Sequence, residues 1–353
     1  GLGRPLDGPG FARRSVRAAV AAGATVRTGV SATGWAGPLT LEATAATGLE
    51  TLTARVVILA TGARERPRSA RLVPGTRPAG VLTTGELQQS VHLYGVRRER
   101  LGRRAVVIGA EPVSRHAVGT LRRAGVEVVA MITDQPRGPR RFGAVPPPPL
   151  LTGARVTELL GRGWLAGVAV GRHDGRVGTI RCDTAVFTGD WIPDSELSRS
   201  AGVLLDSGTK GPAVDGAFRT ASAGIFAVGN TLRGVESAGA AAGEGRAVAD
   251  AVLRYLAGEP WPGGGVPVVV ESPLRWVAPN RVTDSIGGRP FLLRARVPLV
   301  RPVVSVTQGD RLLHRGQVWG TAWPHRSLRL AAGWVREVDP AGGPVTVTAR
   351  VGT

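Results

Sequence analysis

The sequence predicts an α/β fold built on parallel sheets, followed by a smaller C-terminal unit of antiparallel strands. Short apolar runs bounded by turn residues, such as Ile225–Val228, are typical of strands covered on both faces in a parallel sheet. Residues 103–134 show an apolar strand, a helical stretch and a second apolar strand, which is the pattern of a β-α-β unit. After residue 265, alternating apolar residues and glycine turns indicate hairpins instead.

The elements are expected in an order that alternates strands with helices. The first helix covers 9–22, with Pro9 near its start and Gly23 as its stop. Strands follow over 24–30, 38–44, 52–60, 103–109, 126–132, 154–160, 165–170, 181–187 and 225–228, with helices over 112–124 and 236–256. The stretch 259–265, E-P-W-P-G-G-G, has the composition of a linker, and the C-terminal hairpins begin after it.

The composition bounds the size of the protein and its partners. A chain of 353 residues is long enough for two or three domains. Its net charge of +19 would ordinarily suggest nucleic acid as a partner. However, Lys210 is the only lysine, the arginines are scattered as in a GC-rich coding sequence, and no basic stripe is interleaved with aromatic residues. We therefore expect no nucleic-acid partner.

The residue inventory argues against several kinds of chemistry. Cys182 is the only cysteine, so the chain by itself forms no disulfide or C-x-x-C redox pair. The five histidines show no metal-ligand spacing, so no metal site is expected. Val235 replaces the first glycine of a G-x-S-x-G nucleophile elbow around Ser237, which argues against a hydrolase. No apolar run is long enough to span a bilayer, and a cytoplasmic protein is expected.

The stretch Thr220–Asn230 organises the rest of the chain. Its apolar strand ends at Gly229 and Asn230, and the carboxyl ends of strands are where open α/β sheets bind their ligands. The helix that follows opens near Glu236. Its early glycines, at positions 239, 243 and 245, cost helix propensity, which predicts that something packs tightly against that end.

This stretch resembles the second FAD motif of the flavoprotein superfamily that includes the pyridine nucleotide-disulfide oxidoreductases. In that superfamily an Asp at the position of Asn230 binds the ribitol chain of FAD, and the next helix directs its positive end at the flavin. Ala60, Thr61 and Gly62, which follow an apolar strand, resemble the superfamily's mid-domain motif. The continuation R-E-R-P-R to G-E-L-Q, residues 64–88, is similar to amino-acid, opine and amine dehydrogenase subunits and hydrogen cyanide synthase subunits.

The resemblance implies an FAD-type Rossmann-like domain with an inserted NAD-type Rossmann-like domain. The implied boundaries are 1–102 and 216–262 for the two parts of the FAD-type domain, 103–215 for the inserted domain and 263–353 for the C-terminal β domain. The family's first Gly-rich segment would precede Gly1, which is not a methionine, so the chain is interpreted as N-terminally incomplete. We expect the chain as it stands to bind FAD weakly or not at all, because that segment supplies the N–H groups that hold the pyrophosphate.

The inserted domain departs from the family at its dinucleotide fingerprint. The expected G-x-G-x-x-G reads G-A-E-P-V-S, so Gly109 is kept while Glu111 stands where the second glycine lets backbone approach the pyrophosphate. A carboxylate there adds bulk and repels a dianion. Ile132 occupies the position of the acidic residue that binds the adenosine ribose, and Asp134 lies two residues further on. We therefore expect this domain to keep the fold without binding NAD(P).

These observations and the resemblance together imply an FAD-dependent oxidoreductase that acts on a small amine or amino-acid-like substrate and passes electrons to a partner subunit or another acceptor. Two alternatives remain open: an NAD(P)H-dependent flavoprotein reductase, and a non-catalytic scaffold subunit of an oxidoreductase complex. The implied FAD-binding residues are Ala60, Thr61, Gly62, Gly229, Asn230, Glu236 and Ser237, and Gly109, Ala110 and Glu111 lie where the family binds NAD(P). No residue is identified as a catalytic acid or base, since in flavoproteins the cofactor performs the hydride chemistry.

Overall fold

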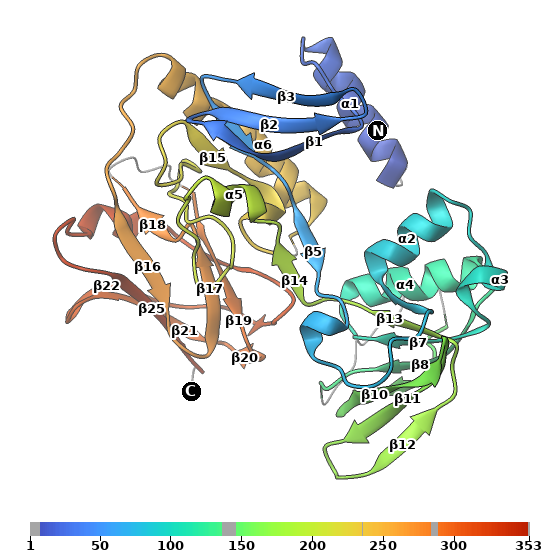
Figure 1. Ribbon diagram of the computed structural model, residues 1–353. Coiled ribbons are helices and arrows are strands. Elements are labelled where there is room, and N and C mark those ends of the chain that lie inside the picture. Colours follow the sequence, from blue (N-terminus) through green and yellow to red (C-terminus); the bar gives the residue numbers. More distant parts are fainter. Residues whose placement is uncertain (1–7, 136–145, 235, 284–288, 352–353) are drawn as a thin grey trace, which may run out of the picture.

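The α/β fold with a C-terminal β part is confirmed. The computed structural model of the protein describes residues 8–135, 146–234, 236–283 and 289–351 (Figure 1). The chain starts with helix α1 (Gly8–Ala21), none of whose residues is buried. None of the described helices is long and apolar enough to cross a membrane.

An antiparallel meander follows α1. It consists of β1 (Val30–Gly37), β2 (Thr40–Ala45) and β3 (Gly48–Thr53). The strand predicted over 24–30 is wrong, since β1 begins only at Val30 and continues beyond the predicted end. Trp35 explains the shift, because its indole N–H donates to the Leu197 carbonyl oxygen 2.9 Å away and ties β1 to the core.

The apolar strand in the stretch Thr220–Asn230 pairs with a strand from earlier in the chain. β15 (Ile225–Ala227) is buried throughout and lies parallel to β4 (Val57–Leu59), with Ala227 beside Leu59. Helix α6 (Ala238–Leu256) comes after this pair, preceded by the short helix η2 (Gly229–Thr231). The predicted linker is anchored rather than loose, since Trp261 packs edge-on against Phe226 and its ring nitrogen donates to the Thr220 carbonyl oxygen.

A second, larger parallel sheet forms the predicted β-α-β region. Its strand order is β6-β13-β7-β8-β9, and every neighbouring pair is parallel. The strands are β6 (Val81–Thr83), β7 (Arg104–Ile108), β8 (Glu127–Ile132), β9 (Leu150–Leu151) and β13 (Thr184–Phe187). The helices are α2 (Thr84–His92), α3 (Arg98–Leu101) and α4 (Pro112–Arg123), so α4 ends close to the predicted stop at Gly125.

Both faces of this sheet are covered, which explains its continuous apolar strands. Val107 and Met131 pack with residues of α2 and α4 on one face. Val106 and Phe187 pack on the other face against an antiparallel meander. That meander contains β10 (Ala154–Arg162), β11 (Trp164–Arg172) and β12 (Val177–Ile180). Cys182 is buried in the second cluster, as expected of a small packing residue.

Two crossover strands join the two α/β regions. β5 (Ala63–Glu65) leads out of the first region and pairs antiparallel with β14 (Trp191–Pro193), which leads back and precedes α5 (Glu196–Ser200). Figure 1 shows this pair as the bridge between the region with β15 and the sheet with β7.

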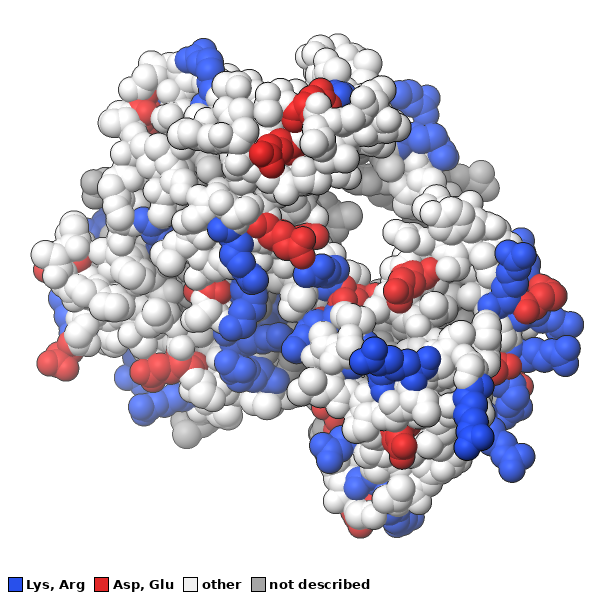
Figure 2. All heavy atoms as spheres, viewed as in Figure 1, with Lys and Arg blue, Asp and Glu red and all other residues white. Residues whose placement is uncertain are grey.

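In Figure 2 an opening is visible between the parts of the molecule that carry α1 and α2, and the cationic side chains are distributed over much of this face.

The C-terminal part is β-rich, as predicted. One sheet has the order β18-β16-β25-β21-β22 and another the order β17-β19-β24, with β20 and β23 as a separate pair. The strands are β16 (Val266–Val270), β17 (Leu274–Ala278), β18 (Arg281–Val282), β19 (Phe291–Ala295), β20 (Leu299–Val300), β21 (Val303–Gln308), β22 (Arg311–Gln317), β23 (Thr321–Ala322), β24 (Leu328–Leu330) and β25 (Val345–Arg350). The only helical element among the described residues of this part is the one-turn η3 (Gly333–Glu337).

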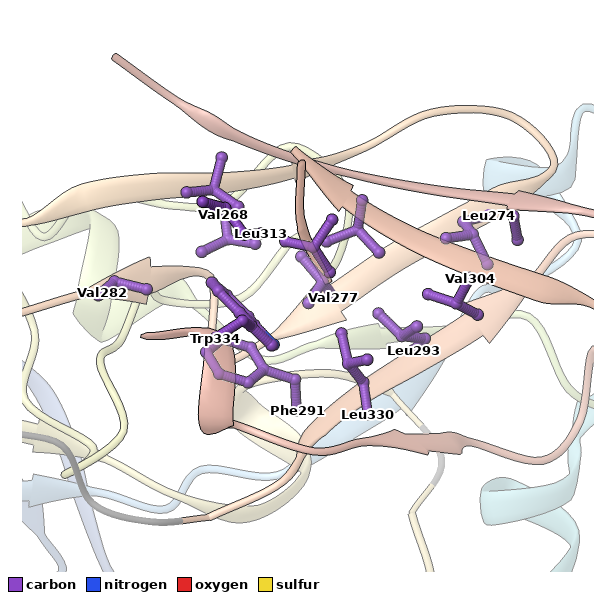
Figure 3. Close-up of a cluster of buried hydrophobic side chains, with 14 of the residues drawn as sticks. Val268, Leu274, Val277, Val282, Phe291, Leu293, Val304, Leu313, Leu330 and Trp334 are labelled. Atoms are coloured by element: carbon purple, nitrogen blue, oxygen red, sulfur yellow. The ribbon is translucent and has the colours of Figure 1, made fainter. Parts of the chain in front are cut away.

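The two sheets enclose one apolar core (Figure 3). Val268, Val304 and Leu313 of the larger sheet meet Leu293 and Leu330 of the smaller one in this core. The predicted Gly309-Asp310 turn joins β21 to β22, whose last pair is Gln308 with Arg311. One pair departs from the antiparallel prediction, because β16 and β25 are parallel. These are the first and last strands of the unit, so no hairpin constrains their direction.

Candidate functional site

The carboxyl ends of β4 and β15 bring two of the predicted motifs together. Ala60 and Thr61 follow β4 and are exposed, while Gly229 and Asn230 follow β15 directly beside them. The hydroxyls of Thr61 and Thr231 lie 2.9 Å apart, and both contact the Asp194 carbonyl oxygen. The two strand ends are therefore held at one edge of the parallel pair, where α/β proteins bind ligands.

The turn from Asn230 into α6 is fixed by two side chains. The Asn230 carbonyl oxygen Oδ1 accepts the backbone N–H of Glu236 at 3.0 Å. Ser237 is the N-cap of α6 and accepts the Ala240 N–H at 3.2 Å. The helix thus begins two residues after the predicted start. Its first turn is exposed at Ala238 and Gly239, so its N–H groups remain open to a ligand.

The early glycines of α6 do not contact a neighbouring element in the described part of the chain. A Cβ atom placed on Gly243 or Gly245 would meet nothing within 4 Å, and on Gly239 only the Ser237 hydroxyl at 3.9 Å. The expected tight packing against this end is therefore not seen among the described residues. The small-residue face stays accessible, and it leaves room for a flat ligand to approach the helix.

Carboxylates and arginines surround this turn. Glu244 of α6 accepts the Gly229 N–H at 2.8 Å and pairs with Arg233, which is 2% exposed. Glu236 pairs with Arg294 of β19 at 2.9 Å and accepts the hydroxyl of Ser327. Burial lowers the pKa of Arg294, and the Glu236 carboxylate opposes this effect. Each carboxylate next to the turn therefore has a cationic partner.

The turn that follows β7 in the five-stranded parallel sheet is filled by side chains of the protein itself. Gly109 follows β7, and Glu111 is the N-cap residue of α4 without a side-chain capping hydrogen bond. The hydroxyls of Ser114 and Thr188 both lie 3.2 Å from Glu111 Oε2. A Cβ atom on Gly109 would come closer than 3.0 Å to both Thr188 and Glu111. The space in front of this glycine is thus occupied by a hydroxyl and a carboxylate.

A second carboxylate lies at the same edge of the sheet. Glu65 is buried and accepts the backbone N–H groups of Gly85 at 3.0 Å and Gly189 at 3.2 Å. Burial raises the pKa of Glu65, and the Gly85 hydrogen bond opposes this. Arg71 lies close by and donates to the carbonyl oxygens of Thr188 and Gly189. Sequence patterns did not identify Glu65 or Arg71. The contacts that bring them to this edge are distant in the sequence, with 124 positions between Glu65 and Gly189 and 117 between Arg71 and Thr188.

The position of the ribose acceptor is also confirmed to be apolar. Ile132 is fully buried, and its carbonyl oxygen accepts the Gly109 N–H at 2.8 Å. Asp134 is exposed, and its carboxylate accepts the Gln135 side-chain amide at 3.3 Å. Asp134 therefore faces solvent rather than the turn at Gly109.

The two turns differ in how they fit the cofactors of the resembled family. At the Asn230 turn the end of β4 and the first turn of α6 are exposed, Asn230 is half-buried, and its amide nitrogen donates to no acceptor among the described residues. These groups fit one part of an FAD molecule. At the Gly109 turn the Glu111 carboxylate fills the pyrophosphate position, which does not fit NAD(P).

Other reactive side chains take no part in either turn. The described residues contain no group of three or more His, Cys, Asp or Glu side chains arranged to bind a metal. Burial raises the pKa of Cys182 to about 12, so its thiol is inert at neutral pH. Burial and the nearby Arg294 lower the pKa of His325.

Comparisons with known proteins show the fold. No protein-family model matches the sequence, and no curated protein matches it. The thioredoxin reductase of T. acidophilum superposes with a TM-score of 0.55 and 23% identity, over 70% of this chain and 81% of that one. The bacillithiol disulfide reductase of Bacillus cereus gives a TM-score of 0.56 and 19% identity, over 73% and 79%. The NAD-dependent persulfide reductase of A. fulgidus gives 0.53 and 17%, over 79% of this chain and 52% of that one.

These similarities confirm the predicted combination of two Rossmann-like regions. The chain shares its fold with thioredoxin reductase and bacillithiol disulfide reductase. The finer resemblance to amine and opine dehydrogenases stays a prediction.

Proposed function

We propose that this protein is an FAD-dependent oxidoreductase. The observation that carries the proposal is the Asn230 turn, where the exposed end of β4 and the half-buried Asn230 after β15 lie at the same edge as the exposed start of α6, in a fold shared with thioredoxin reductase. Ala60, Thr61 and Gly62 would hold the cofactor from one strand end. Gly229, Asn230, Glu236 and Ser237 would hold it from the other. When bound, FAD would supply the hydride-accepting group.

The proposed domain division follows the two parallel sheets. The FAD-type domain comprises 1–102 and 216–262, the inserted NAD-type domain comprises 103–215, and the β domain comprises 263–353. The crossover strands β5 and β14 support this division, because they connect the two sheets in both directions. Gly109, Ala110 and Glu111 keep a structural role in the inserted domain.

The proposed substrate is a small amine or amino-acid-like molecule. The segment 64–88 supports it through its similarity to amine and opine dehydrogenases. A disulfide substrate is disfavoured, since the chain has one cysteine and its thiol pKa is raised to about 12. NADH or NADPH as the reductant is disfavoured by the position of Glu111. The electrons would leave to a partner subunit or another acceptor.

An FAD titration tests the cofactor assignment. Flavin fluorescence is followed while the protein is added, and weak but saturable quenching is expected. Asn230→Ala is expected to weaken binding about fivefold, since one hydrogen bond to a ligand is worth about 1 kcal/mol. Gln317→Ala is the matched control, because this exposed amide lies on β22 of the β domain. Equal affinity in the Asn230→Ala protein would contradict the assignment.

A dye-reduction assay tests the substrate class. The protein is mixed anaerobically with FAD, an artificial electron acceptor and a panel of primary amines, secondary amines and amino acids. Dye reduction that requires both the protein and one class of amine is expected. Reduction that occurs with NADH and with none of the amines would replace the proposal by the flavoprotein reductase alternative.

A further inference from the structure

A charged cluster lies where the C-terminal sheets meet the Asn230 turn. Its members are Arg233, Glu236, Glu244, Trp276, Arg294 and Ser327, named below the Trp276 cluster. Trp276, Arg233 and Arg294 are at most 5% exposed. The first three members belong to the turn and α6, whereas the last three belong to the C-terminal part. The cluster is therefore a buried contact between the C-terminal part and the segment that contains the Asn230 turn and α6.

Both arginines of the cluster lie over the same indole ring. The guanidinium carbon of Arg294 is 5.0 Å from the centre of the Trp276 ring, and that of Arg233 is 6.0 Å away. Such cation–π contacts are attractive when the cation is removed from water. Two like charges over one ring still repel each other, so the arrangement needs nearby carboxylates. Glu236 and Glu244 supply them.

Three acceptors among the described residues help to fix the orientation of Arg294. Its Nη1 donates to the Pro324 carbonyl oxygen at 3.1 Å. Its Nη2 donates to Glu236 at 2.9 Å and to the Ser327 hydroxyl at 2.9 Å. A planar guanidinium satisfies acceptors in several fixed directions, whereas a lysine ammonium is a single point charge. The position of the Glu236 carboxylate is thus set from the β-domain side.

The two glutamates also hold the turn, Glu244 through its carboxylate and Glu236 through its backbone N–H. The N–H of Glu236 donates to Asn230 Oδ1 at 3.0 Å, and the N–H of Gly229 donates to Glu244 at 2.8 Å. Each residue of the Gly229-Asn230 pair is therefore bonded to a residue whose carboxylate pairs with an arginine. Loss of Arg294 would leave Glu236 buried without its closest cation, which favours movement of that side chain toward water.

We propose that Arg294 is a positioning residue, which fixes the Asn230 turn through Glu236, so that the C-terminal sheets set the affinity of this turn for its ligand. The identity of that ligand as FAD rests on the proposed function. Arg294 does not itself need to contact the cofactor. Its effect is to hold the Asn230 side chain and the start of α6 in the geometry that the ligand meets.

Hydrogen exchange followed by mass spectrometry tests the positioning role without any cofactor. The variants are Arg294→Met, which removes the charge, and Arg294→Lys, which keeps it. The control is Arg296→Met, since Arg296 is exposed and its Nε donates to the Leu274 carbonyl oxygen outside the cluster. In Arg294→Met the amides of Gly229 and Glu236 are expected to exchange about tenfold faster, because local opening sets their exchange rate. Arg294→Lys should restore part of the protection, and Arg296→Met should change nothing there.

The amides of β21 and β25 report whether the C-terminal sheets remain folded. Unchanged exchange at Gly229 and Glu236 in Arg294→Met, with these strands still protected, would overturn the proposal. If the strands lose protection, Ser327→Ala becomes the deciding variant, since it removes one donor to Glu236 and leaves Arg294 in place. About threefold faster exchange at Glu236 is then expected from a smaller local opening free energy, and no change would overturn the proposal.

FAD titration of the same variants separates the two proposals. Arg294→Met is expected to weaken FAD binding about tenfold, with partial recovery in Arg294→Lys and none of the loss in Arg296→Met. If the unmodified protein binds no FAD, the proposed function fails, while the exchange result still decides the positioning role. If Arg294→Met binds FAD as tightly as the unmodified protein, the positioning role fails and the proposed function stands.

Discussion

The two strand-to-helix turns of this protein have the same architecture and opposite surroundings. In each, a parallel strand is followed by a glycine with a positive φ, +76° at Gly229 and +132° at Gly109, and the chain then enters an α-helix, α6 at Ala238 and α4 at Pro112. At the Asn230 turn the end of β4 and the start of α6 are exposed, and Asn230 is half-buried. The Gly109 turn is filled by Glu111 and Thr188. The strand and helix packing preserves the fold at both turns, and the atoms in front of the glycine decide what can bind.

Replacing each of the two glycines with alanine should show the difference between the two turns most clearly. Gly109→Ala should destabilise the protein by about 2 to 5 kcal/mol, since backbone strain adds to overpacking against Thr188 and Glu111. Gly229→Ala should cost only about 1 to 2 kcal/mol, because its Cβ would meet nothing closer than Ala241 at 3.8 Å and only the positive φ is strained. Urea unfolding of both variants measures the difference. Equal losses would mean that the two turns are filled alike.

A pair of substitutions should convert the Gly109 turn toward ligand binding. Glu111→Gly removes a charge worth about 1 to 4 kcal/mol against a pyrophosphate at surface-like dielectrics. Ile132→Glu adds the missing ribose acceptor. Together they should create measurable NADH binding, seen as enhanced nicotinamide fluorescence, where neither change alone has much effect. Tight NADH binding by the unmodified protein would refute the role given to Glu111.

The sequence predicted the elements whose signals are local. The β-α-β unit, the hairpin at Gly309, the helix ends and the departure at Glu111 all follow from neighbouring residues. The start of β1 was missed because Trp35 is fixed by Leu197, 162 positions away. The Trp276 cluster was missed for the same reason. The pattern of apolar and polar residues around Arg294 does not distinguish a buried arginine from an exposed one. Pairings between distant segments carry no periodic signal.

A pH series on Glu65→Gln sharpens the description of the Gly109 edge. Because burial raises the pKa of Glu65, the folded state holds this proton more tightly than the unfolded state. The stability that protonated Glu65 contributes is fully present below the pKa of this carboxyl in the unfolded state. It is lost as the pH rises through the pKa of the same carboxyl in the folded state. The variant should therefore gain stability relative to the unmodified protein as the pH rises from about 4 to 7, by less than about 1.4 kcal/mol per unit of pKa shift. A pH-independent difference in urea midpoints would show that Glu65 is not desolvated.

The smallest effect is expected at Asp134. Its carboxylate is exposed and accepts only the neighbouring Gln135 amide in the described structure. Asp134→Asn should change the unfolding free energy by no more than about 0.5 kcal/mol. It should also leave NADH binding by the Glu111→Gly, Ile132→Glu protein unchanged. A loss of that binding would show that Asp134 reaches the ribose after all.

Equilibrium dialysis against an equimolar mixture of FAD and NADH tests the central claim most directly. The protein retains whichever dinucleotide its turns accept, and the two are distinguished by their absorbance. FAD should be retained in excess over NADH, and Asn230→Ala should abolish that excess. Retention of NADH equal to or greater than that of FAD by the unmodified protein would contradict the account.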